Sequence, residues 1–291
     1  MRRTVAGVAM AAVLTMAVVD MEREAWGQEA PQAVQPAQSL PHPEDAKAWE
    51  AVYRMGKMLK FETVLFLHYR YGYQARSGGG YAYANSFSIG RGYLTMKVTP
   101  AAWFEGRITL DSSQDTTGDF KIRLKYLYGL LKLPIETVAI SDPGIELGMV
   151  HMPWLDYEEH VNWYRMQGTM FMERNKLFNS ADLGITAFAL LGKKLPKKYQ
   201  EEVNGKYPGT WGSISLGVYN GSGYHGIENN AGKSFEGRIS VRPIGPVFPN
   251  LQLSYFVIAG RGNMAGTRDY MAPEWVSHAI MASLEHRYFV V

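Results

Sequence analysis

A short segment rich in acids holds the residues most suited to chemistry. Asp156, Glu158, Glu159 and His160 stand close together in the sequence. Carboxylates and an imidazole are the raw material of metal sites and of acid–base catalysis. The spacing fits no metal motif, because H-E-x-x-H is missing and His160 has no second histidine four residues on. We therefore expect these groups to be solvated or ion-paired, with no metal and no cofactor.

Nucleophilic and phosphate-binding motifs are equally weak. No G-x-S-x-G motif occurs, and the glycine-rich strings at 78–80 and 260–262 fall in expected hairpin loops rather than between a strand and a helix. Such glycines are most simply turn residues. The sequence thus predicts no catalytic residue and a protein that is not an enzyme.

Basic side chains recur at every second position of several segments. In the run 121–126 (KIRLKY), cations alternate with apolar residues, and 104–111, 211–218 and 235–242 show a similar alternation of polarity. Successive side chains of a strand point to opposite faces, so one face favours water and the other favours lipid.

A water-filled lumen bordered by these cations would raise the local concentration of anions. Glu105, Asp111 and Glu236 share the same expected faces, so the predicted anion preference is weak. The alternative is that these charges form a lattice of salt bridges that stiffens the wall and gives no ion selectivity. The pore-lining candidates are Arg91, Lys97, Arg107, Lys121, Arg123, Lys125, Arg238 and Arg242.

The first residues predict export. Arg2 and Arg3 precede an apolar run from Val5 to Val19, which is shorter than the roughly 20 residues of a membrane-spanning helix. We expect residues 1–27 to be a cleaved signal peptide, although an uncleaved anchor helix is the alternative. Residues 28–60 are expected to form a Pro/Gln-rich spacer followed by a short periplasmic helix from about 45 to 60.

Composition narrows the class of the exported part. The chain has no cysteine, so its fold is stabilised without disulfides, and its 30 glycines and 18 tyrosines suit turn-rich strands with aromatic faces. A formal net charge of +3 does not indicate nucleic acid as a partner.

Residues 61–291 are expected to form an all-β, antiparallel transmembrane barrel in the outer membrane. Segments of about ten residues with alternating polarity are separated by Gly, Pro, Asn and Asp clusters, which is typical of such barrels. The expected strands, about ten in number, lie at 61–73, 84–99, 102–112, 119–132, 144–152, 182–192, 210–220, 233–243, 250–259 and 274–291.

The connection at 153–181 is the longest between expected strands, and it is dense in aromatic and charged residues. Long connections with many large apolar groups are usually functional and pack against something. We expect it to narrow the lumen, the alternative being an external cap that packs on its own residues. The constriction-loop candidates are Trp154, Asp156, Glu158, Glu159, His160, Arg165, Glu173 and Arg174.

The texture of several segments resembles the phosphate-selective porin O and P family. The resemblance rests on the runs 217–221 (GVYNG), 228–230 (ENN) and 237–243 (GRISVRP), and on Met152-Pro153-Trp154 entering the long loop. It implies a sixteen-stranded barrel in the outer membrane, usually a homotrimer, whose third loop enters the lumen and whose basic residues guide small anionic solutes such as phosphate. No particular residue of this sequence matches the family's phosphate ladder.

About ten expected strands are fewer than the resemblance implies, so we expect a C-terminally incomplete part of a larger barrel. The expected function is passive diffusion of small solutes, with a weak preference for anions. Two alternatives stay open. One is a barrel sleeve around a partner such as an extracellular electron-transfer protein. The other is a secreted β-sandwich binding module, whose apolar face would point inward.

Overall fold

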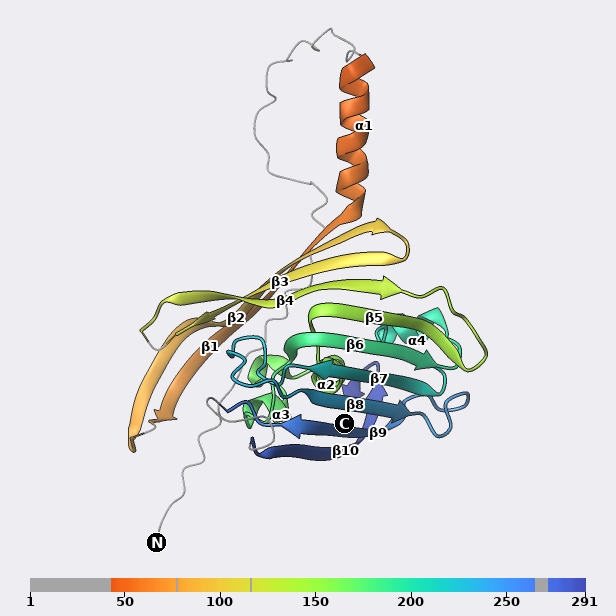
Figure 1. The fold of residues 1–291 in the computed structure, drawn as a ribbon. Helices are drawn as coiled ribbons and strands as arrows, with labels where there is room; N and C mark the ends of the chain where they lie inside the picture. Colours follow the sequence, from red (N-terminus) through yellow and green to blue (C-terminus); the bar gives the residue numbers. More distant parts are fainter. Residues whose placement is uncertain (1–42, 77, 116, 265–271) are drawn as a thin grey trace.

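The fold is known from a computed structural model that describes residues 43–76, 78–115, 117–264 and 272–291. The expected signal peptide and most of the expected spacer lie outside these residues. The described part begins with α1 (Pro43–Met58), which projects away from a large curved sheet (Figure 1). The short helix expected at about 45–60 is confirmed. No helix in the described part combines the length and apolar character that crossing a membrane requires.

All the expected strands are present, with boundaries that differ by a few residues. They are β1 (Leu59–Ala75), β2 (Tyr81–Ala101), β3 (Phe104–Gln114), β4 (Phe120–Lys132), β5 (Ile140–His151), β6 (Ala181–Leu191), β7 (Gly212–Tyr219), β8 (Ser234–Val241), β9 (Leu251–Arg261), β10 (Glu274–His286) and β11 (Phe289–Val290).

The final expected strand, 274–291, is wrong in one respect. The chain turns back at Arg287 and Tyr288, and the two-residue β11 pairs with the end of β10 through Glu285↔Val290 and His286↔Phe289.

The described strands form one antiparallel sheet in which each strand pairs with the next along the chain, in the order β1 to β11. This simple meander agrees with the predicted antiparallel all-β class. The sheet is curved but not closed into a barrel, because β1 pairs only with β2 among the described residues. Figure 1 shows α2 (Pro153–Val161) and α3 (Phe171–Arg174) within the curve of this sheet.

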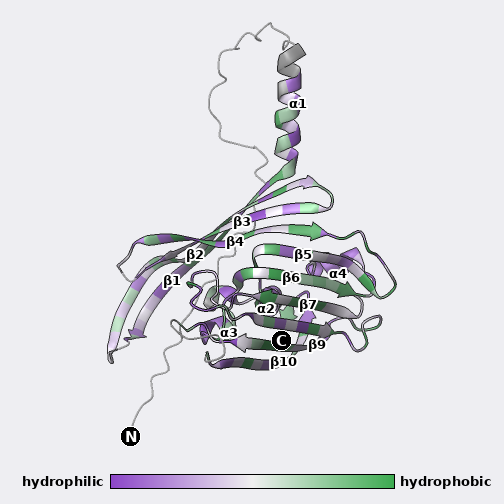
Figure 2. Cartoon of the chain, viewed as in Figure 1, coloured by the Kyte–Doolittle hydropathy of each residue, from purple (hydrophilic) through white to green (hydrophobic). Residues whose placement is uncertain are grey.

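Side-chain polarity is inverted with respect to a soluble sheet. In β8, Glu236, Arg238 and Ser240 are fully buried on the concave face, whereas Phe235 and Ile239 are about 40% exposed on the convex face. The alternation of hydrophobic and hydrophilic residues along the strands is visible in Figure 2. The convex face of neighbouring strands is also apolar, with exposed side chains that include Leu183, Ile185, Leu216, Val218, Leu253 and Tyr255.

A bulge in β4 changes the predicted faces of the run 121–126. The pairing of β3 with β4 slips between Thr109↔Tyr126 and Leu110↔Leu124, so Lys125 is the extra residue. An extra residue shifts the side-chain phase of the strand that carries it. The prediction that Tyr126 shares the lipid face is therefore wrong, because Tyr126 and Lys125 are both buried.

The apolar core lies between the concave face and the β5–β6 connection. Phe256 of β9 contacts Trp154 and Phe178 of this connection, with ring centroids 5.3 and 5.2 Å apart. Leu155 and Met170 are fully buried in the same cluster. The longest connection thus packs on the sheet rather than only on its own residues.

Candidate constriction site

Two hydrogen bonds hold the start of the β5–β6 connection on β8. The backbone N–H of Trp154 donates to Glu236 Oε1 at 2.8 Å, and Arg238 Nε donates to the carbonyl of Pro153 at 3.1 Å. Proline at the first position favours helix entry, and Asp156 lies in the first turn, where an acid complements the helix dipole. Helix α2 therefore starts at a fixed point above the concave face.

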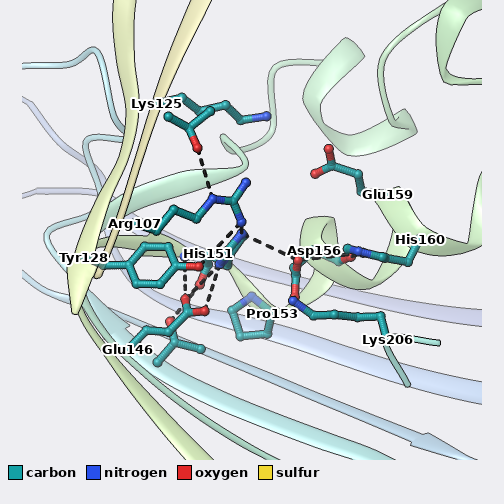
Figure 3. A network of polar contacts seen from close by, with 12 residues as sticks. Arg107, Lys125, Tyr128, Glu146, His151, Pro153, Asp156, Glu159, His160 and Lys206 are labelled. Atoms are coloured by element: carbon teal, nitrogen blue, oxygen red, sulfur yellow. Dashed lines mark hydrogen bonds and ion pairs between the residues drawn. The ribbon is translucent and has the colours of Figure 1, made fainter. Parts of the chain in front are cut away.

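The side chain of His151, the last residue of β5, lies between Arg107 of β3 and Asp156 of α2. Arg107 of β3 donates from Nη1 to His151 Nε2 at 3.2 Å, and Glu146 of β5 lies 2.9 Å from His151 Nδ1 (Figure 3). The two ring nitrogens of His151 thus lie between a guanidinium and a carboxylate.

Asp156 of α2 is held by groups from the far end of the sheet. Its carboxylate accepts a hydrogen bond from the Tyr207 hydroxyl and lies 3.4 Å from Lys206 Nζ, both in the β6–β7 connection. Burial raises the pKa of Asp156, but Lys206, His151 and His160 lower it more, so the pKa lies well below its usual range. Asp156 is consequently an anion at neutral pH.

Glu159 faces the cationic wall one helical turn further on. Figure 3 shows Glu159 of α2 and Lys125 of β4 pointing toward each other across the space between helix and wall. Glu159 also pairs with Arg165 of the same connection. Burial raises the pKa of Glu159, but Lys125 and Arg165 lower it more. The helix side of this space is therefore acidic and the sheet side is basic, which creates a transverse field.

The β5–β6 connection lines several cavities, two of which bear on the site. One has a volume of about 210 Å³ and includes Glu146, His151, Asp156 and Lys206 in its lining. The other has a volume of about 460 Å³ and is bordered by Arg91 and Arg123 as well as by later residues of the connection. The polar network from Arg107 to Lys206 is thus next to open space.

The predicted pore-lining residues divide into distinct groups. Arg91 and Arg123 line the larger cavity, and Arg107 and Lys125 form the basic side of the network. Lys97 lies 3.2 Å from Glu62, an ion pair that fits the lattice alternative at that position. Lys121 is mostly exposed at the end of β4 and pairs with Asp115 at 2.9 Å.

Arg238 and Arg242 are fully buried, as Lys125 is, and both are hydrogen-bonded to other parts of the protein. Arg238 bonds to Pro153, Ser213 and Ser240, and its guanidinium lies over the Tyr157 ring at 4.5 Å. Arg242 donates to backbone carbonyls of Gly209, Tyr207 and Pro249. These two arginines anchor connections instead of facing a solute.

The predicted constriction residues lie in the β5–β6 connection, and only some of them approach the wall. Asp156, Glu159, His160 and Arg165 belong to the network described above. The Trp154 indole donates to Glu158 at 2.9 Å, and Glu158 accepts the Phe171 backbone N–H. Burial is the main reason that the pKa of Glu158 is raised.

Glu173 and Arg174 do not pair with each other in the structure. Glu173 accepts from Thr169 and Ser180, whereas Arg174 donates to the carbonyl of Thr169 at 3.2 Å. The expected burial of the aromatic rings holds for Trp154 and Tyr157, while other rings of the connection, such as Phe171, are exposed.

Sequence reasoning missed Glu146, His151, Lys206 and Tyr207. Glu146 lies in the middle of β5 and His151 is its last residue, and neither belongs to a motif. The sequence did contain a signal for Lys206 and Tyr207. They lie in the 193–209 connection, which is longer than the short turns expected at the periplasmic end of a barrel. That length allows the connection to fold inward until Tyr207 packs against Tyr157, with ring centroids 5.3 Å apart.

Comparison of the chain with known protein families, with curated proteins and with solved structures finds no match.

Proposed function

We propose that this chain is the wall and constriction loop of an outer-membrane porin that passes small solutes and weakly prefers anions. The inverted polarity of the sheet carries the proposal. A soluble β-sandwich places its apolar face inward, whereas here charged side chains are buried on the concave face and aliphatic side chains are exposed on the convex face. Exposed aliphatic strand faces suit lipid as their solvent.

The distribution of exposed aromatic residues supports a membrane location. Trp103, Trp211 and Tyr288 are exposed at strand ends and turns, while exposed aliphatic residues such as Leu216 and Ile239 occupy the middle of strands. Aromatic residues at the two interfaces and aliphatic residues between them are typical of membrane barrels. The outer membrane is the proposed location.

The open sheet supports a larger closed assembly. A barrel in lipid must satisfy every backbone group at its edges, and β1 has a partner on one side only within the described residues. We propose that further strands complete a sixteen-stranded barrel like that of the phosphate-selective porin O and P family, assembled as a homotrimer.

The opposed charges of the wall and of α2 support a weak rather than a strong preference for anions. Lys125 and Arg107 supply positive charge from the wall, and Asp156 and Glu159 oppose it from α2. A solute that passes the network experiences the field of both signs, so net selectivity depends on a small difference.

Planar-bilayer recording of the full chain, extracted from outer membranes, tests the proposal. We expect stepwise conductance and, in a salt gradient, a reversal potential on the anion side. A protein that stays soluble without detergent contradicts the membrane location. Absence of conductance steps contradicts the pore, and a cation-side reversal potential contradicts the anion preference alone.

A further inference from the structure

The larger cavity, of about 460 Å³, has a size typical of small-molecule sites. Its lining comes from strands on opposite sides of the curve, including Arg91 of β2, Arg123 of β4 and Trp275 of β10, and from the loop residues Phe178 and Tyr224. The cavity therefore places guanidinium groups and aromatic rings around one space.

The acidic side chains of this cavity are already satisfied by the protein. Asp182 accepts the backbone N–H groups of Leu183 and Gly221, each at 2.7 Å. Glu173 accepts hydrogen bonds from Thr169 and Ser180. Both carboxylates thus have donors of the protein as partners, while Arg91, Arg123 and Lys176 bring three cations to the same lining.

Arg91 and Arg123 flank β3 and retain donors for a ligand. The hydrogen bond from Arg123 Nη2 to Ser113, at 3.1 Å, uses one of the five N–H donors of that guanidinium. Arg91 donates from Nη1 to Tyr93 and lies 3.4 Å from Asp111 through Nε. A guanidinium has five N–H donors in a planar fork that matches a carboxylate.

Aromatic rings border another part of the cavity. Phe178 is held by stacking on Phe256, and the Tyr224 ring packs edge-on against His225 at 4.6 Å. Trp275 completes this side from β10. Such rings favour an apolar or aromatic body over a fully hydrated ion.

We propose that the cavity binds a small monocarboxylate with an aromatic ring, its carboxylate on Arg91 and Arg123 and its ring against Phe178, Tyr224 and Trp275. This inference rests on the proposed function, because it names the solute class that the pore would take up. Benzoate is the simplest probe of the class.

Two measurements on the purified full chain test the site. Calorimetric titration in detergent measures binding without requiring conduction, and planar-bilayer recording measures block of chloride current by the same probe. We expect benzoate to bind more tightly than acetate, benzyl alcohol or inorganic phosphate, since only benzoate offers both the carboxylate and the ring. Equal binding of acetate, or tighter binding of phosphate, overturns the proposal.

Matched variants assign the binding to the two sides of the cavity. Arg123→Gln is expected to weaken benzoate binding about tenfold or more through loss of charge-assisted hydrogen bonds. Lys132→Gln, at the far end of β4 and paired with Glu105, is expected to leave binding unchanged. Trp275→Leu should weaken benzoate about threefold to tenfold and leave acetate unaffected, whereas Trp103→Leu should change neither. A heat-dependent gel shift confirms that each variant is folded.

The two readouts separate this site from the pore. Benzoate binding that depends on Arg123, in a protein without conductance steps, overturns the pore and supports the site. Normal conductance with no calorimetric binding of benzoate overturns the site and leaves the pore standing. Binding that Arg123→Gln and Lys132→Gln reduce equally also overturns the site.

Discussion

At the scale of single residues, Asp156 and its neighbours show how the β5–β6 connection is fixed. Lys206, Tyr207 and His160 surround a carboxylate that is largely withdrawn from water. A buried charge is stable only when it is paired and hydrogen-bonded. Asp156 therefore ties the connection at one end of the sheet to the connection at the other end.

Asp156→Asn should make the protein less stable at neutral pH and less sensitive to acid. The folded pKa of Asp156 lies below the unfolded value, so its stabilisation is fully present above about pH 4 and is lost as pH falls further. We expect a loss of roughly 1–3 kcal/mol at pH 7 that shrinks below pH 4. Urea unfolding at several pH values measures it. Glu136→Gln in the exposed β4–β5 connection is the control, and a pH-independent difference would contradict the role of the charge.

Lys125 and Glu159 should shift ion selectivity in opposite directions. Lys125→Gln removes positive charge from the wall and should move the reversal potential toward cations. Glu159→Gln removes negative charge from α2 and should move it toward anions. Recording in a salt gradient measures both, and Lys132→Gln serves as the neutral comparison. Shifts of the same sign in both variants would show that the transverse field does not control permeation.

At the scale of elements, β7 depends on a close approach between its own residues. The Tyr219 ring folds over Gly217, and a Cβ at position 217 would lie 1.9 Å from the Tyr219 hydroxyl. That hydroxyl is hydrogen-bonded to Thr186 of β6 at 2.7 Å. Glycine is thus required here to let an aromatic side chain cross the strand.

Gly217→Ala should displace the Tyr219 ring and destabilise the sheet by about 1–3 kcal/mol. Gly92→Ala in β2 is the matched control, because a Cβ there meets no atom closer than 3.9 Å. The midpoint of urea unfolding, followed by the gel shift, compares the two variants with the parent chain. Equal midpoints for Gly217→Ala and Gly92→Ala would mean that the Tyr219 ring moves at no cost.

At the scale of the whole molecule, the convex face must meet an apolar solvent if the proposed function is right. A charge introduced near the middle of a strand should oppose insertion. Leu216→Arg in β7 is expected to make insertion into the membrane less favourable by about 2–4 kcal/mol. Folding into lipid vesicles from urea measures it. Ile227→Arg, in the β7–β8 connection, should have no effect, and equal behaviour of the two variants would argue against a lipid-facing wall.

The sequence by itself determined the strands and their two faces. Alternation of polarity is a local property, since it follows from the geometry of one strand and needs no knowledge of its neighbours. Adjacent residues such as Arg238 and Ile239 can therefore be assigned to opposite faces of their strand from the sequence alone. The expected strand positions agree with β1 to β10 for this reason. Whether the sheet closes depends instead on which strands pair at its two edges, and the polarity pattern of a single strand does not contain that information.

Only the tertiary structure decided which side chains form the candidate constriction site. Tyr207 meets Asp156 across 51 positions of sequence, and Arg107 meets His151 across 44. Such pairs depend on how two connections fold over a curved sheet, and no local period encodes that. The bulge at Lys125 is a second case, because a single extra residue turned Tyr126 inward against the alternation. Local periodicity specifies faces, whereas contacts between distant segments arise from packing in three dimensions.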